Sequence, residues 1–245
     1  MMSYFEIKGL AKSFGGLMAL YDINLSIEKG EIVGLIGPNG SGKTTLFNCI
    51  NNFCTPDQGQ ILFKGQRIDG FPTHRICKLG IARTFQIVKP LKRLTVLDNV
   101  MAGAFLHTND EKQAREKSLS VLESCELSHR KDMPGKDLPI ADKKRMEVAR
   151  ALASDPELLL LDETAAGLNL KEIERMLEIV MRIRQSGITC LVVEHVLKFL
   201  MGVSDRVMCI NFGQEIVTGK PQEVMSHPEV IAAYLGAEYA KGRLH

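Results

Sequence analysis

A glycine-rich segment in the first fifth of the chain constrains the fold more than any other feature of the sequence. It reads Gly37-Pro38-Asn39-Gly40-Ser41-Gly42-Lys43-Thr44 and fits the pattern G-x4-G-K-[ST]. Residues 31–36 before it are nearly all apolar, as in a strand buried on both faces, and residues 45–50 after it read as a helix. A strand, a glycine turn and a helix in this order form the context in which the motif binds phosphate groups. The chain is therefore predicted to contain an α/β core with a phosphate-binding loop.

The chemistry of this segment favours a nucleotide as its ligand. Glycines let successive backbone N–H groups turn inward onto phosphate oxygens, and the N-terminus of the following helix adds a favourable dipole. Lys43 is expected to neutralise the β- and γ-phosphates, and Thr44 is expected to bind Mg²⁺ through its hydroxyl. The predicted contacts to the nucleotide are Gly37, Pro38, Asn39, Gly40, Ser41, Gly42, Lys43, Thr44 and Thr45.

Charge and hydropathy argue against several classes of protein. The 245 residues include 31 basic and 29 acidic side chains, and the resulting net charge of +2 does not favour a nucleic-acid partner. The N-terminus has neither the basic nor the apolar part of a signal peptide, and no apolar stretch approaches the roughly 18 residues of a membrane span. The six cysteines form no C-x-x-C pair and are predicted to be reduced thiols. If the protein works at a membrane, we expect another subunit to span it.

The first and middle parts of the chain predict different secondary structure. Residues 5–7, 23–27 and 61–63 alternate apolar and polar side chains, as half-buried strands do. The middle shows no comparable strand pattern, and Thr95 and Asn109 suit the starts of helices there. The helices predicted in the middle are 95–106, 109–125 and 142–154.

The final third alternates strands and helices, which favours a mainly parallel sheet. Its predicted elements are a buried strand at 157–161, an amphipathic helix at 170–185 closed by Gly187, a buried strand at 188–193, a helix from about His195, and a hairpin of 206–211 with 214–218.

Two carboxylates, Asp162 and Glu163, follow the buried strand predicted to end at Leu161. Ligands of open α/β sheets bind at the carboxyl ends of the strands, which is where these side chains are expected to lie. Asp162 can hold Mg²⁺ through the water shell of the ion, and Glu163 can polarise an attacking water. The same pattern also occurs where a strand ends in a solvated acidic turn, but its presence in a chain with a phosphate-binding loop favours catalysis.

The order of further short motifs makes the chain similar to a known family. Thr84-Phe85-Gln86 lies between the loop and the helical middle, residues 164–169 follow the two carboxylates, and a buried strand leads to Glu194-His195. In this order they resemble the ATPases of ABC transporters over essentially the whole chain. The resemblance implies a P-loop NTPase of ABC type, with a mainly parallel sheet core, an antiparallel β subdomain and an inserted α-helical subdomain at about 88–154. It further implies one domain over residues 1–245, with ATP and Mg²⁺ as cofactors.

The resemblance also assigns roles to individual residues. Gln86 is implied to contact Mg²⁺ or the attacking water and to sense the membrane subunit, and His195 is implied to contact the γ-phosphate. Residues 166–169 are implied to reach a partner subunit, and Phe14 to stack on adenine. The predicted catalytic set is Glu163, His195, Gln86 and Lys43, and the predicted metal set is Thr44, Gln86 and Asp162.

Within the family, the chain most resembles the ATPases of branched-chain amino-acid importers. The similar segments are 81–86, 163–169, 193–195 and 228–236, and lipopolysaccharide-export ATPases share parts of the last one. The resemblance implies an ATP-hydrolysing subunit peripheral to the cytoplasmic side of the inner membrane. An export ATPase of the lipopolysaccharide type and a soluble ABC ATPase outside transport are the alternatives.

The implied partners are integral membrane permease subunits, a second ABC ATPase chain and a solute-binding protein. The helical subdomain and residues 86–91 are expected to form the groove that receives a cytoplasmic helix of the permease. Contacts to the solute lie in other subunits, so the sequence identifies the solute only through the resemblance.

One segment departs from the family pattern, which normally reads L-S-G-G-Q at the start of the helix before the two carboxylates. This chain has Leu138-Pro139-Ile140-Ala141-Asp142. Pro139 removes a hydroxyl and an N–H, Ala141 replaces a close-approach glycine, and Asp142 is expected to repel a phosphate. In the family each ATP lies between the P-loop of one chain and this signature segment of the other. Two interpretations stay open: a degenerate segment, which a heterodimer would compensate, or a divergent segment that works, as in a homodimer.

Overall fold

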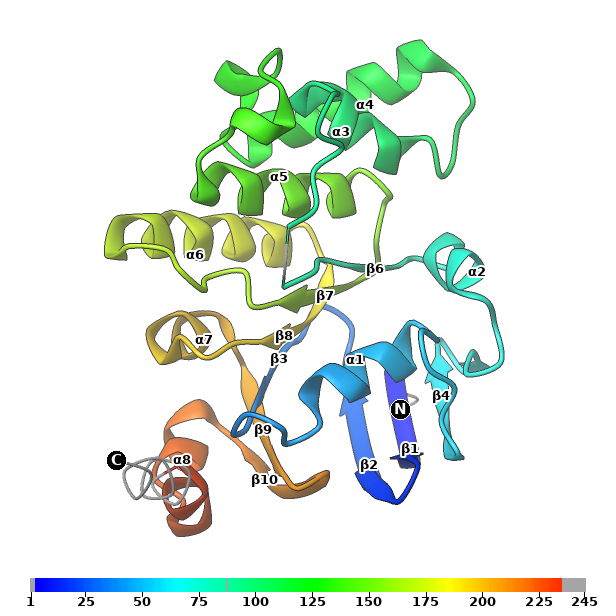
Figure 1. Cartoon of the computed structure of the whole chain (residues 1–245), viewed down its shortest axis with the longest axis vertical. Coiled ribbons are helices and arrows are strands. Elements are labelled where there is room, and N and C mark those ends of the chain that lie inside the picture. The colour runs from blue at the N-terminus through cyan, green and yellow to red at the C-terminus, as the bar shows by residue number, and fades with distance from the viewer. Residues whose placement is uncertain (1–2, 87, 235–245) are drawn as a thin grey trace. The chain divides into compact units, whose positions relative to one another are not determined.

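Two compact units make up the chain, and the computed structural model describes residues 3–86 and 88–234 of it (Figure 1). Unit 1 comprises Met1–Ile76 and Ser204–His245, and unit 2 comprises Cys77–Val203. Helix α2 (Thr73–Lys78) contains the first junction between them. Ile87 and residues 235–236, which contributed to the expected docking groove and to the resemblance, lie outside the described residues. The assignment of one domain to residues 1–245 stays a prediction.

Unit 1 contains an antiparallel sheet with the strand order β2-β1-β4-β5. Phe5, Ile7 and Leu10 of its central strand are almost fully buried, because alternate residues of a strand face the same side. Phe5 pairs with Ile27 in β2 and with Phe63 in β4, so the predicted half-buried strands lie side by side. The strands are β1 (Phe5–Phe14), β2 (Leu17–Ile27), β4 (Gln58–Phe63) and the short β5 (Gln66–Arg67).

Unit 1 also contains a group of strands that is partly parallel. The completely buried β3 pairs in parallel with β9, and β9 pairs antiparallel with β10 across the turn at Phe212-Gly213. Residues 228–234 are helical and end the described part of the chain. The named elements here are β3 (Ile32–Ile36), α1 (Lys43–Ile50), β9 (Arg206–Asn211), β10 (Gln214–Gly219) and α8 (Pro221–Met225).

Unit 2 is built on the parallel strands β6, β7 and β8, with β7 pairing to both of the others. Every residue of β7 and β8 is buried, as the nearly continuous apolar sequence predicts for parallel strands. Helix α6 begins at a capping box formed by Asn169 and Glu172 and buries one apolar face. The elements are β6 (Ile81–Arg83), β7 (Leu158–Asp162), α6 (Leu170–Gln185), β8 (Thr189–Val193) and α7 (Leu197–Val203).

The helical part of unit 2 lies between β6 and β7 in the sequence. Thr95 and Asp98 form a capping box at the start of α3, as predicted. The predicted cap of the next helix is wrong by one residue, because Asp110 rather than Asn109 accepts the backbone N–H groups of the first turn. The elements are α3 (Val96–Ala104), α4 (Glu111–Ser124), the 3₁₀ turns η1 (Ser128–Arg130) and η2 (Gly135–Asp137), and α5 (Ile140–Leu152).

Parallel strands, an antiparallel sheet and a helical segment are thus all present, which confirms the predicted fold class. The helix predicted at 170–185 has the observed bounds. The sequence did not predict β5, α2 or β6, which have two, six and three residues and are too short for a clear periodic pattern. In the described part of the chain, no helix combines the length and apolar character needed to cross a bilayer.

Candidate nucleotide site

The glycine-rich loop lies in unit 1 between β3 and α1. Gly37, Gly40 and Gly42 have φ values of 154°, 81° and 109°, which residues with a Cβ rarely adopt. A Cβ on Gly42 would lie 2.6 Å from the carbonyl oxygen of Ala19, so the loop also needs glycine for space. Glycine at these positions therefore permits the left-handed turns that are typical of anion-binding loops.

Lys43 is the first residue of α1, and its side chain returns over the loop. Its Nζ donates hydrogen bonds to the carbonyl oxygens of Gly37, at 2.7 Å, and Pro38, at 3.0 Å. Gly42 occupies the N-cap position and has no side chain, so no side-chain hydrogen bond caps the helix. A buried ammonium and uncapped N–H groups of a first helical turn both favour a bound anion.

The other predicted nucleotide contacts in unit 1 are accessible to a ligand. Asn39, Gly40 and Thr44 are exposed, while Pro38 and Thr45 are half-buried. Phe14 ends β1 with half of its surface exposed, and the Nζ of Lys12 lies 5.4 Å from the centre of its ring. An exposed aromatic face of this kind is suited to stacking on a base.

Two later segments of the chain hold the loop from within unit 1. The carbonyl oxygen of Ser41 accepts a 3.0 Å hydrogen bond from the N–H of Gly213, in the turn between β9 and β10. The hydroxyl of Tyr234 accepts a 3.0 Å hydrogen bond from the N–H of Gly37. The sequence predicted neither contact, because each joins residues that are far apart in the chain.

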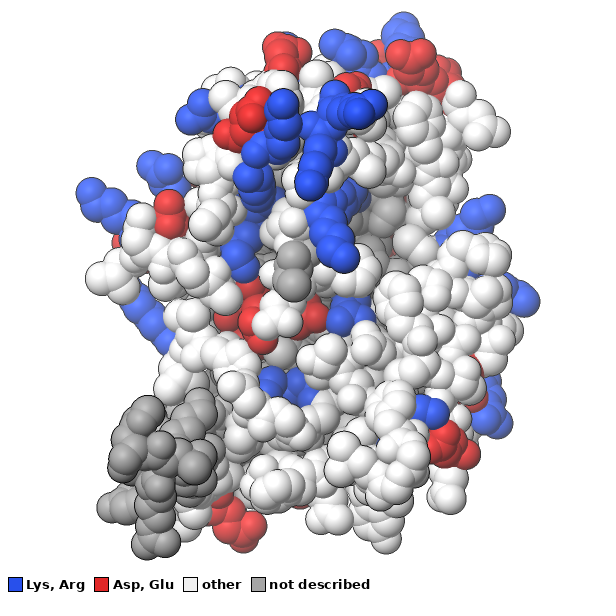
Figure 2. Space-filling model, in the orientation of Figure 1, with Lys and Arg blue, Asp and Glu red and all other residues white. Residues whose placement is uncertain are grey.

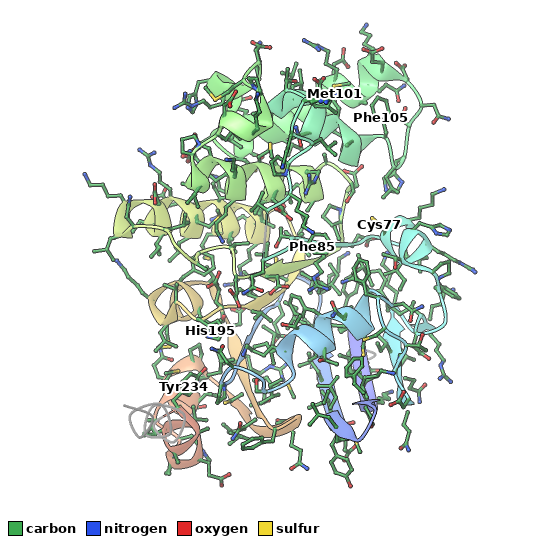
Figure 3. The ribbon with its side chains drawn as sticks, viewed as in Figure 1. Cys77, Phe85, Met101, Phe105, His195 and Tyr234 are labelled. Atoms are coloured by element: carbon green, nitrogen blue, oxygen red, sulfur yellow. The ribbon has the colours of Figure 1, made fainter. Side chains whose placement is uncertain are left out.

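In unit 2, three predicted catalytic residues meet at one carboxylate. Oε2 of Glu163 accepts a 2.7 Å hydrogen bond from Nε2 of Gln86, and Oε1 lies 3.4 Å from Nε2 of His195. His195, labelled in Figure 3, lies between β8 and α7. The carboxylate is mostly shielded, with 15% of the Glu163 side chain exposed, whereas the His195 side chain is 37% exposed. A shielded carboxylate beside two accessible polar groups is a suitable place for activating a water.

The backbone of Glu163 is held as firmly as its side chain. Its φ is 50°, in the left-handed region, and its N–H donates to the carbonyl oxygen of Val193 at 2.9 Å. Its own carbonyl oxygen accepts a 2.5 Å hydrogen bond from Nζ of Lys144. Burial lowers the pKa of the Lys144 ammonium. Lys144 was missed by the sequence analysis, since a lysine in a helix is usually a solvated residue.

Asp162 forms a buried ion pair with Arg83. Oδ2 of Asp162 lies 2.7 Å from a guanidinium nitrogen of Arg83, and both side chains are less than 10% exposed. The hydroxyl of Thr84 accepts the N–H of Asp162 at 3.0 Å, which joins β6 to the end of β7. Arg83 was not predicted as a site residue, although it stands three positions before Gln86 in a segment that carried the family resemblance.

Glu194 is a second buried carboxylate next to the predicted site. Its Oε1 accepts hydrogen bonds from the N–H of Ala165, at 2.6 Å, and from the hydroxyl of Thr164, at 3.3 Å. Burial raises the pKa of Glu194 above its ordinary value, and these hydrogen bonds act in the opposite direction. The side chain therefore fixes the turn that follows Glu163.

The signature segment forms the start of α5, as its place in the sequence predicted. Pro139 is the N-cap of α5, so its missing N–H costs the helix nothing, and no side chain caps the helix. Asp142 is buried, and its carboxylate pairs with Arg145 in the next turn and with Nε of Arg130 at 3.5 Å. Because two guanidinium groups neutralise it, Asp142 is not the free carboxylate from which repulsion of a phosphate was expected.

The segment around Gln86 combines exposed apolar and basic side chains. Phe85 and Leu91 are each more than 40% exposed, and Lys89 is exposed as well. Asn99 is completely buried and holds this segment, because its amide exchanges hydrogen bonds with both backbone groups of Leu91. Figure 2 shows Lys and Arg side chains gathered over the part of unit 2 that carries α3 and α5.

The chemistry of the predicted metal residues fits Mg²⁺. Within residues 3–86 and 88–234, no group of three or more His, Cys, Asp and Glu side chains could hold a metal ion. Mg²⁺ in nucleotide sites typically takes one or two protein oxygens and completes its shell with phosphate oxygens and water. The hydroxyl of Thr44, the amide oxygen of Gln86 and the carboxylate of Asp162 are hard oxygen donors of this type.

Comparison with known sequences identifies the family. The sequence profile described as "ABC transporter" matches residues 20–166, which is more than half of the chain. The chain belongs to the ABC transporter ATPase family. A second profile, described as "Branched-chain amino acid ATP-binding cassette transporter", matches residues 214–240 of this ABC ATPase. The resemblance to the ATPases of branched-chain amino-acid importers is thereby confirmed.

Curated relatives of this ABC ATPase span almost its whole length. The high-affinity branched-chain amino acid transport ATP-binding protein LivG of Escherichia coli strain K12 is 38% identical and covers 94% of this chain and 97% of its own. A probable LivG of Archaeoglobus fulgidus is 37% identical, with 97% of each chain covered. The lipopolysaccharide export system ATP-binding protein LptB of Haemophilus influenzae is 34% identical and covers 97% of this chain and 99% of its own.

Solved structures support the same fold. The ADP conformation of MJ1267, an ATP-binding cassette of an ABC transporter, matches with a TM-score of 0.88 and 31% identity over 96% of this chain and 100% of its own. A nucleotide-free ATP-binding cassette from an ABC transporter matches with a TM-score of 0.85 and 30% identity, covering 95% of this chain and 99% of its own. The chain is therefore an ATP-binding subunit with the ABC ATPase fold.

Proposed function

We propose that this chain hydrolyses ATP to power a membrane importer of branched-chain amino acids. The observation that carries the catalytic part is the meeting of Gln86 and His195 at the carboxylate of Glu163. Glu163 was assigned from the buried strand before it, and Gln86 and His195 were assigned through the family resemblance. The three residues come from different parts of unit 2. A chance group of polar side chains would not be expected to consist of the residues chosen for one reaction.

The glycine-rich loop is proposed to bind the phosphates of ATP. Residues 37–45 supply backbone N–H groups, and Lys43 moves its ammonium from the carbonyl oxygens of Gly37 and Pro38 to the β- and γ-phosphates. Phe14 stacks on adenine through its exposed ring. Binding of this kind gives affinity mainly through charge and backbone donors.

Mg²⁺ is proposed to be bound through Thr44, Asp162 and Gln86. When bound, the ion supplies charge that stabilises the phosphate oxygens during transfer. The pairing of Asp162 with Arg83 fixes the carboxylate at the end of β7, where a water of the metal shell can contact it. The amide nitrogen of Gln86 donates a hydrogen bond to Glu163. Its amide oxygen is suited to contact the ion or the attacking water.

Glu163 is proposed to polarise the water that attacks the γ-phosphate in line. His195 contacts the γ-phosphate through its exposed imidazole. Hydrogen bonds from Lys144 and to Val193 fix the backbone of Glu163, which keeps its carboxylate in place. Because little covalent chemistry falls to the protein, positioning and charge stabilisation supply most of the catalysis.

The proposed partners are integral membrane permease subunits, a second ABC ATPase chain and a solute-binding protein. The exposed side chains of Phe85, Lys89 and Leu91 favour the segment around Gln86 as the docking site for a permease helix. The expected location is therefore peripheral, on the cytoplasmic side of the inner membrane. The second ATPase chain is proposed to differ from this one. The signature segment of this chain has Pro139 in place of a serine and Ala141 in place of a glycine, so a partner with the usual residues would complete the nucleotide site.

The choice of solute and direction follows from the relatives. The profile for branched-chain amino acid transport matches residues 214–240, and LivG proteins of a bacterium and an archaeon are similar over the whole chain. Export of lipopolysaccharide is the second candidate, because LptB is 34% identical over 97% of the chain. Measuring which class of permease co-purifies with the tagged chain separates these two.

Two substitutions test the proposed reaction. Glu163→Gln should lower the ATPase rate of the assembled transporter by roughly 10²–10⁴-fold and leave ATP affinity nearly unchanged, because it removes the base and no phosphate contact. Lys43→Ala should weaken ATP binding by roughly ten- to a hundredfold, since a charged hydrogen bond is lost. Steady-state hydrolysis and binding of a fluorescent nucleotide separate the two effects.

The matched control for Glu163→Gln is Glu178→Gln, which changes a residue of α6 outside the buried apolar face of that helix, in the same unit. It should alter neither rate nor affinity. Equal loss of nucleotide binding in the Glu163 and Lys43 variants would contradict the assigned roles.

A further inference from the structure

The end of the described chain reaches the phosphate-binding loop through one side chain. Tyr234 belongs to the helical residues 228–234 and is labelled in Figure 3 beside that helix. Its hydroxyl accepts the 3.0 Å hydrogen bond from the N–H of Gly37, the first residue of the glycine-rich motif. Burial raises the pKa of Tyr234, so the hydroxyl stays protonated around neutral pH.

Both backbone groups of Gly37 are held by side chains. Its N–H is bound by Tyr234, and its carbonyl oxygen accepts the 2.7 Å hydrogen bond from the ammonium of Lys43. Its Cα lies so close to the carbonyl oxygen of Ile210 in β9 that a Cβ would overlap with it. The hydroxyl of Tyr234 and the phosphate-binding lysine thus hold the two sides of one residue.

The same C-terminal part of the chain holds the loop at a second point. The N–H of Gly213 donates to the carbonyl oxygen of Ser41, and a Cβ on Gly213 would lie 2.6 Å from the carbonyl oxygen of Ala19. This contact is made by backbone groups in a tight hairpin, so it has no side-chain atom that can be deleted. The contact from Tyr234 depends on a single hydroxyl and can be removed alone.

The surroundings of Tyr234 show how the terminal helix is placed. Val224 in α8 and Val230 in the terminal helix are almost completely buried, so the helix is anchored in unit 1. A cavity of about 710 Å³ is lined by the loop, the β9–β10 turn and the helix, and residues 38–41, Phe212, Glu229 and Ala232 contribute to it. The loop therefore borders open space on this side, and the hydroxyl of Tyr234 binds its first residue.

We propose that Tyr234 is a positioning residue for ATP, which keeps the phosphate-binding loop in its binding conformation before the nucleotide arrives. The segment that matches the branched-chain amino-acid transporter profile, residues 214–240, includes Tyr234, so a group-specific part of the chain acts on the general phosphate-binding loop. This inference rests on the proposed function for its effect on turnover, and its structural part is testable without hydrolysis.

If Tyr234 holds the loop ready for ATP, removing its hydroxyl should change loop opening and ATP affinity by predictable amounts. Without the hydroxyl, the N–H of the buried Gly37 has lost its partner, and opening of the loop should become about tenfold more frequent. ATP then binds a loop that is less often in the right conformation, so affinity should fall by at most about tenfold, in proportion to the loss of the binding-competent fraction. The rate at saturating ATP should change by less than about twofold, because bound phosphate itself orders the loop.

The test is Tyr234→Phe, which keeps the ring and removes only the oxygen. In the nucleotide-free chain, hydrogen exchange followed by mass spectrometry should show about tenfold faster exchange in the peptide containing Gly37. Fluorescent-nucleotide binding should give the lower affinity, and the ATPase rate should show a raised KM with a nearly unchanged kcat. Tyr21→Phe is the matched control, since Tyr21 is half exposed on β2 of the same unit and should leave all three measurements unchanged.

Two results would overturn the inference. One is an unchanged exchange rate at Gly37 in Tyr234→Phe. The other is a loss of affinity accompanied by faster exchange throughout unit 1 and a lower melting temperature, which would indicate a general structural role. If the natural chain binds ATP but does not hydrolyse it, the proposed function is contradicted. The exchange and affinity measurements would then still test the role of Tyr234.

Discussion

The loop before α1 and the segment before α5 both lead into a helix whose first turn is not capped by a side chain. Gly42 and Pro139 occupy the two N-cap positions, and neither offers a side-chain acceptor. The other helices of eight or more residues named above, α3, α4 and α6, are capped by Thr95, Asp110 and Asn169. Uncapped N–H groups therefore occur at the two places where the family resemblance implies a phosphate, and not at the other three.

The starts of α1 and α5 differ in the charged side chains that lie in their first turns. In the loop before α1, glycine conformations and backbone contacts fix the structure, and Lys43 supplies the charge. In the segment before α5, Asp142 lies in the first turn, and Arg130 and Arg145 neutralise its carboxylate. The second segment thus lacks a hydroxyl and a glycine, but the carboxylate that was expected to repel a phosphate is paired with two arginines.

The largest effect is expected in the loop before α1, where the structure leaves no room for a side chain. Gly42→Val places a Cβ 2.6 Å from the carbonyl oxygen of Ala19 at a φ of 109°, so the loop must move and ATP binding should become undetectable. Gly187→Ala is the control, because its φ of 87° gives a similar conformational cost with no atom within 4 Å of the added Cβ. Titration with a fluorescent nucleotide checks both variants, and normal binding by Gly42→Val would show that the loop is not as constrained as the comparison requires.

A smaller effect is expected when the arginine that neutralises Asp142 is removed. Arg145→Met leaves a buried carboxylate short of its main partner and should lower the free energy of unfolding by about 3–5 kcal/mol. The double variant Asp142→Leu/Arg145→Met should recover most of this loss, because the buried carboxylate is gone and the side chain of Arg130, its second partner, is 37% exposed to water. Urea unfolding of the natural chain and both variants measures the free energy of unfolding. If the single and double variants are equally unstable, Asp142 is not neutralised by Arg145, and the expectation of repulsion returns.

The sequence predicted most fully those features that depend on neighbouring residues. The buried strands, the bounds of α6 and the loop before α1 follow from local pattern, turn chemistry and motif spacing. The family resemblance then placed Gln86, Glu163 and His195 in one reaction, and the structure brings their side chains together.

What the sequence could not predict depends on residues that are distant in the chain. Arg83 pairs with Asp162 across 79 positions, and Tyr234 reaches Gly37 across 197 positions. The misjudgement of Asp142 has the same origin, because a single sequence shows its negative charge and does not show that Arg130 folds back onto it. Strands β5 and β6 were missed because two or three residues are too few to show a period.

The most direct test compares the ATPase rate of the isolated chain, measured against its concentration, with that of two variants. The natural chain should hydrolyse ATP slowly, because a homodimer would pair two complete loops with two signature segments that lack a hydroxyl. Pro139→Ser/Ala141→Gly should raise the rate by about a hundredfold, in line with the roughly 2.7–4 kcal/mol contributed by one preorganised donor. Asp142→Gln alone should not raise it, since the carboxylate is already neutralised. Rapid turnover by the natural chain with second-order dependence on its concentration would contradict the proposed pairing with a different ATPase chain.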